Sequence, residues 1–124
     1  MLVRYLVRDD PDQAAIVERL VTEVATAEET VHLDTIVLCE TVWVLESGYG
    51  YAKAAIADAL DKLLLTQQFE IEGRDDVWRA LSRFKNGGAD FADSLIGEKN
   101  RSNGCLSTCT FDQALQGEEG FEIL

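Results

Sequence analysis

The chain has 124 residues, 47% of them hydrophobic and 27% charged, which are the proportions of an ordinary globular protein with one core. Its formal net charge of −12 argues against a plain nucleic-acid-binding module, because such modules bind phosphates through Lys and Arg. That charge is compatible with an enzyme whose acids hold divalent cations. With no long apolar run and no signal peptide, we expect a single cytoplasmic domain over residues 1–124, without a membrane segment.

The first third of the chain predicts two helices and a strand. A short apolar segment opens the chain, and Asp10 and Pro11 then suit the N-cap and first position of a helix that runs to about residue 25. Residues 31–33 have the composition of a short strand. The helix from Pro11 to about residue 25 is expected to bury Ala14, Ile16, Val17, Leu20, Val21 and Val24.

A helix capped by Asp34 or Thr35 and ending near Ser47 carries the first candidate site residue, Glu40. The large apolar side chains three or four positions from Glu40 predict that its carboxylate is embedded in an apolar face. The alternative is a glutamate that reaches solvent from the edge of that face. The flanking residues are Ile36, Val37, Trp43 and Val44.

The middle of the chain predicts two further helices around a strand. Apolar spacing indicates a helix from residue 53 to about 67, and residues 69–72 alternate with the period of a strand. Asp75 or Asp76 is expected to start the next helix, which ends at the Gly87-Gly88 pair. We expect this helix to face inward with Val77, Trp78, Leu81 and Phe84.

The glycine pair leads into a helix that carries two more candidate acids. Asp90 is a suitable N-cap, and Asp93 lies one turn later beside the apolar stripe, at the positive end of the helix dipole. A capping role alone explains Asp90 equally well. A lone acid in the position of Asp93 would be costly without a cation nearby.

The last quarter predicts two strands, over residues 105–110 and 121–124. Asp112 follows the first of them, at the strand end where open α/β sheets bind ligands, although a turn-forming role is an alternative. Strands separated by helices predict an α/β fold with a mostly parallel sheet. His32 and the three cysteines are expected to be core residues, and surface cations that could meet a substrate are Arg79, Arg83, Lys85, Lys99 and Arg101.

Four acids therefore emerge as a candidate metal site: Glu40, Asp90, Asp93 and Asp112. Carboxylates crowded at one side of a sheet repel one another unless a hard cation lies among them, and an oxygen-only ligand set favours Mg²⁺ or Mn²⁺ over zinc.

Residues 2–11, 38–45, 87–96 and 110–112, in this order and spacing, resemble the PIN-domain nucleases, and among them the VapC-type toxins of toxin–antitoxin pairs. The resemblance implies a PIN-like three-layer fold and a Mg²⁺- or Mn²⁺-dependent endoribonuclease. It further implies that Glu40, Asp93 and Asp112 are the catalytic metal ligands, that Asp90 is an accessory acid, and that the chain forms a homodimer and binds a cognate antitoxin.

The chain departs from the family pattern at its beginning. In the family, a central first strand ending in an Asp-Thr-Asn type motif precedes the segment that resembles residues 2–5, and its Asp is a principal metal ligand. Neither is present here, so we hypothesise a start site placed too late or a truncated gene. The alternative function is a catalytically inactive PIN-like protein whose acidic pocket holds a basic protein partner.

Overall fold

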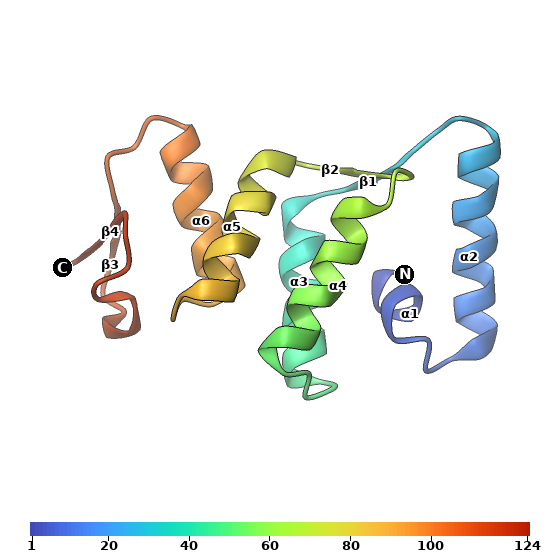
Figure 1. Cartoon of the computed structure of the whole chain (residues 1–124), viewed down its shortest axis with the longest axis horizontal. Coiled ribbons are helices and arrows are strands. Elements are labelled where there is room, and N and C mark those ends of the chain that lie inside the picture. The colour runs from blue at the N-terminus through green and yellow to red at the C-terminus, as the bar shows by residue number, and fades with distance from the viewer. The chain divides into compact units, whose positions relative to one another are not determined.

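The computed structural model describes all 124 residues, which form two compact units, Met1–Glu72 and Gly73–Leu124 (Figure 1). Each unit combines helices with one two-stranded parallel sheet, so the predicted mixture of helices and parallel strands is confirmed. No helix has the length and hydrophobicity that a bilayer span requires.

Two helices of the first unit begin where the sequence predicts. The carboxylate of Asp10 accepts the Gln13 N–H at 3.1 Å, and that of Asp34 accepts the Val37 N–H at 2.8 Å, so both predicted N-caps are present. Its elements are α1 (Leu2–Val7), α2 (Pro11–Thr26), β1 (Val31–Leu33), α3 (Thr35–Ser47), α4 (Lys53–Leu65) and β2 (Phe69–Ile71).

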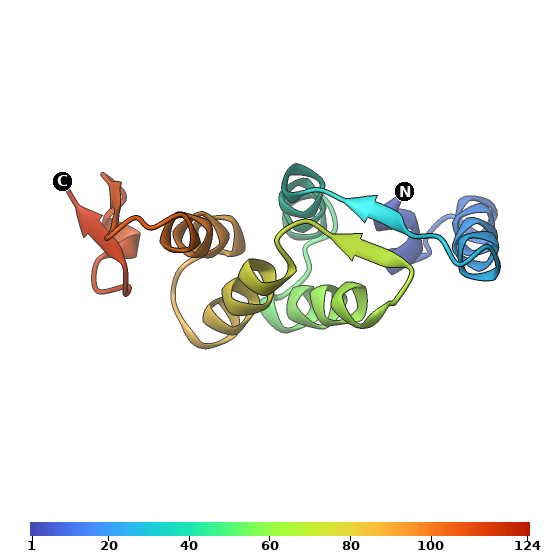
Figure 2. The same ribbon diagram turned by 90° about the horizontal axis from the view of Figure 1, so that it is seen from above.

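Strands β1 and β2 lie side by side and parallel, with Val31 opposite Phe69 and Leu33 opposite Ile71 (Figure 2). They are the whole of this sheet, so β1 has a strand neighbour on one edge only. In a parallel pair, alternate residues direct their backbone groups to opposite edges. The Val31 N–H and the Leu33 carbonyl bond the β2 side, which directs the His32 backbone to the other edge.

Two expectations about the buried faces of the first unit are wrong. Ile16 is 61% exposed and Leu20 39%, because α2 packs mainly against the six-residue α1, which covers only a narrow stripe around Ala14 and Val17. On α3, Ile36 is exposed, and the core is formed by the opposite face, which contains Leu38, Val42 and Leu45.

The second unit contains α5 (Arg74–Asn86), α6 (Phe91–Ser102), β3 (Thr108–Thr110), the 3-10 helix η1 (Gln113–Leu115) and β4 (Phe121–Ile123). Helix α5 follows Gly73, whose φ of 59° is left-handed, so Asp75 and Asp76 occupy its first turn rather than cap it. Trp78 is 54% exposed, contrary to the predicted inward position. Helices α5 and α6 pack together, with the rings of Phe84 and Phe91 edge to face at 6.3 Å.

Candidate metal-binding carboxylate site

Asp90 caps α6, as its position after the glycine pair predicts. Its Oδ1 accepts the backbone N–H of Asp93 at 2.7 Å, and its carbonyl accepts the N–H of Ser94. This hydrogen bond uses one carboxylate oxygen and fixes the start of α6 next to Asp93. The capping role is therefore established for Asp90, and it leaves an oxygen for a further role.

Asp112 follows the end of β3 and caps η1. Its N–H donates to the Thr110 hydroxyl at 3.0 Å, and its Oδ1 accepts the Ala114 N–H at 2.9 Å. The turn-forming role weighed from sequence is thus present. It also places the exposed carboxylate at the carboxyl end of a parallel strand.

Asp93 is the half-buried member of the group. Burial raises the pKa of its carboxyl above the ordinary value, and the negative charges of Asp90 and Asp112 raise it further. The negative charges of Asp90 and Asp112 thus act on Asp93 within the second unit.

The chemistry of these three acids suits a hard divalent cation, because all the side-chain donors are oxygens and their mutual repulsion would fall on binding. Within either unit, however, no three His, Cys, Asp or Glu side chains are arranged as a ready ligand set. The negative charges of the three acids therefore favour a cation, but these acids alone do not form a complete set of metal ligands.

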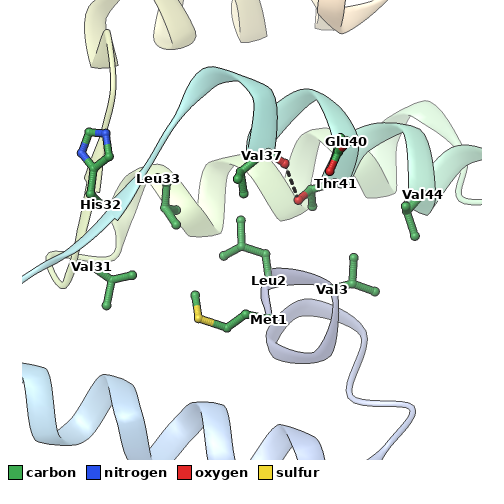
Figure 3. A pocket seen from close by; sticks show the side chains of 10 residues that line it. All are labelled: Met1, Leu2, Val3, Val31, His32, Leu33, Val37, Glu40, Thr41 and Val44. Atoms are coloured by element: carbon green, nitrogen blue, oxygen red, sulfur yellow. Dashed lines mark hydrogen bonds between the residues drawn. The ribbon is translucent and has the colours of Figure 1, made fainter.

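Glu40 belongs to α3, in the first unit. The prediction of an embedded carboxylate is wrong, because Glu40 is exposed and its neighbours Ile36 and Trp43 are 70% and 67% exposed. The side chain reaches solvent, as the alternative proposed, and lies at a cavity of about 460 Å³ between α1, β1 and α3 (Figure 3). The cavity is lined by Met1, Leu2, Val3, Val31, His32, Leu33, Val37, Glu40, Thr41 and Val44.

Three of the cations considered for substrate contact form ion pairs within the second unit. Arg83 Nη1 lies 3.3 Å and Arg79 Nε 3.4 Å from the carboxylate of Glu98, which is only 2% exposed. Arg101 pairs with Glu119 at 3.5 Å. Sequence reasoning missed Glu98 because its partners on α5 are more than ten residues away. An acid on the apolar stripe of α6 was the only available signal.

Contrary to expectation, the histidine and the cysteines are not core residues. His32 is exposed and lies 3.4 Å from the Glu70 carboxylate across the β1–β2 pair. Cys105 and Cys109 are exposed and Cys39 is half-buried. Both expectations came from the apolar composition of short runs, whose burial depends on which face is covered.

A comparison with protein-family models matches residues 1–116 to the PIN domain. The chain belongs to the PIN domain family. The match spans both units and contains all four candidate acids, and no curated protein and no solved structure matched the chain. PIN domains form a nuclease superfamily that generally depends on divalent metals and acts on RNA.

Proposed function

We propose that this PIN domain is a VapC-type toxin that hydrolyses RNA phosphodiester bonds with the help of Mg²⁺ or Mn²⁺. The observation that carries the proposal is the environment of Asp93, which is half-buried beside two further carboxylates. Such an arrangement is costly for a metal-free protein and favourable once a divalent cation neutralises it. The match to the PIN domain over residues 1–116 supports one functional domain that includes both units.

In this mechanism Asp93, Asp112 and Glu40 would hold the ion, which is the role that the family resemblance implies for them, and Asp90 would assist. A bound divalent ion supplies positive charge to the phosphodiester and favours ionisation of the attacking water. The Asp90 carboxylate fixes the first turn of α6 and so orients Asp93. The Ala114 N–H fixes the carboxylate of Asp112.

We also propose that a further strand, bearing the acid that the family places there, pairs with the open edge of β1. Support comes from β1 itself, which has one strand neighbour and borders the cavity that Glu40 lines. An open strand edge is a template for another strand. Residues ahead of Met1 in a longer form of the protein, or a second chain, would supply it.

The partners proposed for this chain are an RNA substrate, a second copy of the chain and a cognate antitoxin, all in the cytoplasm. A basic antitoxin side chain would be attracted to the carboxylates, since the chain carries a net charge of −12. The exposed apolar side chains of α3, Ile36 and Trp43, suit a protein interface.

The test is cleavage of a labelled RNA with EDTA, Mg²⁺ or Mn²⁺. We expect metal-dependent internal cleavage that leaves 5′-phosphates, and its loss in Glu40→Gln and Asp93→Asn. Glu46→Gln is the matched control, because Glu46 is an exposed acid on the same helix as Glu40 and is expected to leave cleavage intact. Absence of cleavage under all conditions, together with binding of a basic peptide, would instead identify an inactive binding protein.

A further inference from the structure

Glu118 joins the loop that carries Asp112 to the turn that leads into Asp90 and Asp93. Its Oε1 accepts the backbone N–H of Gly88 at 2.9 Å, across 30 residues of sequence. This hydrogen bond connects two segments that each carry a candidate acid. Glu118 is not one of the acids named in the proposed function.

The glycine pair makes room for this carboxylate. A Cβ at Gly87 would lie 3.3 Å from Glu118 Oε2 and 3.0 Å from the Arg83 carbonyl, closer than ordinary contacts. A side chain at position 87 would therefore crowd both the Arg83 carbonyl and the Glu118 carboxylate. The sequence pattern of two glycines before Asp90 thus has a partner elsewhere in the chain.

The Glu118 side chain is itself held in place. It is 22% exposed, and its Oε2 lies 3.9 Å from Arg83 Nη2, which also donates to the Glu119 carbonyl at 2.5 Å. The Glu118 N–H donates to the Leu115 carbonyl at 3.0 Å, which connects it to η1 and so to Asp112. Arg83 therefore lies beside the Glu118 carboxylate, and η1 holds the Glu118 backbone.

We propose that Glu118 is a positioning residue, whose bond to Gly88 holds the Asp112 loop against the start of α6 and so keeps Asp112 beside Asp90 and Asp93. As a role in metal binding this rests on the proposed function. The bond itself is testable without any metal.

The first arm measures water exchange of backbone amides by NMR in EDTA, well below the melting temperature. In Glu118→Ala we expect exchange at Gly88 and at Ala114, whose N–H bonds Asp112, to rise at least roughly 10-fold, with Leu81 in α5 unchanged. Glu118→Gln keeps an acceptor and should resemble the wild type. The proposal is overturned if Ala114 is unaffected by Glu118→Ala, or if Glu118→Gln behaves as Glu118→Ala does.

The second arm measures Mn²⁺ affinity by calorimetry. We expect Glu118→Ala to weaken binding roughly 10-fold or more, as for other residues that orient metal ligands, and Glu118→Gln to retain it. Glu119→Ala is the matched control, since it removes the same charge from an exposed neighbour. Equal losses in Glu118→Ala and Glu119→Ala would reduce the effect to charge and overturn the positioning role. If the wild type binds no Mn²⁺, the proposed function fails and the exchange arm alone decides on Glu118.

Discussion

Asp93 experiences two unfavourable influences on its charge, partial burial and two neighbouring carboxylates. Its pKa is raised in the folded protein, so the folded state holds the proton more tightly than the unfolded chain does. The stability that this provides is present at pH values below the ordinary pKa and is lost as the pH rises through the raised pKa. At neutral pH the ionised Asp93 therefore destabilises the metal-free protein.

We predict that Asp93→Asn raises the melting temperature of the metal-free protein at pH 7. The gain should shrink as the pH falls and vanish below the ordinary Asp pKa of about 4, where the wild-type side chain is also neutral. Thermal melts in EDTA across this range measure it. Asp12→Asn, an exposed acid in the first turn of α2, is the control, and should cost about 0.3–1 kcal/mol. A lower melting temperature for Asp93→Asn at pH 7 would show that Asp93 is structural.

Sequence spacing was informative for the acids of the second unit and poor for Glu40. Asp90 and Asp112 stand at helix starts, where local hydrogen bonds determine their positions, so the chain pattern alone places them. The surroundings of Glu40 depend on which face of α3 is covered, which local spacing does not determine. Glu118 was missed because its partner, Gly88, is 30 residues away.

At the scale of elements, the beginnings of helices could be predicted better than their buried faces. Asp10, Asp34 and Asp90 cap the helices as expected, because a cap is a contact within three residues. The exposed positions of Leu20 and Trp78 were not foreseen, because burial depends on contacts between elements that are distant in sequence. The two short sheets confirm the expected parallel pairing.

Gly97 determines how closely β4 packs on α6. A Cβ at this position would lie 2.9 Å from Phe121 Cζ, which explains a glycine inside a helix. We predict that Gly97→Ala destabilises the protein by about 1 kcal/mol, because overpacking of about 1–3 kcal/mol exceeds the gain of about 1 kcal/mol in helix propensity. In a Phe121→Leu background the same change should be neutral or stabilising, as measured by denaturant unfolding. Stabilisation in the wild-type background would refute the packing argument.

The ion pair between α5 and α6 provides a second test at this scale. We predict that Arg83→Leu destabilises the protein by about 3 kcal/mol, because it leaves the buried carboxylate of Glu98 with only the more exposed Arg79. Arg101→Leu removes the exposed pair with Glu119 and should cost about 0–1 kcal/mol. Urea unfolding measures both variants. Equal costs would mean that burial of Glu98 adds nothing to the pair.

At the scale of the whole molecule, the candidate acids are divided between two compact units, with Glu40 in one and the three aspartates in the other. The family match over residues 1–116 contains the candidate acids of both units. The order of the four motifs predicted this family from sequence, because motif order survives when local burial predictions fail.

The central claim is that these carboxylates hold a divalent cation. The most direct measurement is a thermal melt in EDTA and in millimolar Mn²⁺, for the wild type, Asp93→Asn and Glu46→Gln, repeated with an added strand if a longer sequence supplies one. We predict that Mn²⁺ raises the melting temperature of the wild type and of Glu46→Gln. At a tenfold excess of Mn²⁺ over Kd, the gain in the free energy of unfolding is about 1.4 kcal/mol. The melting temperature of Asp93→Asn should stay unchanged. The account is contradicted if Asp93→Asn responds as the wild type does, or if no form of the protein responds to the metal.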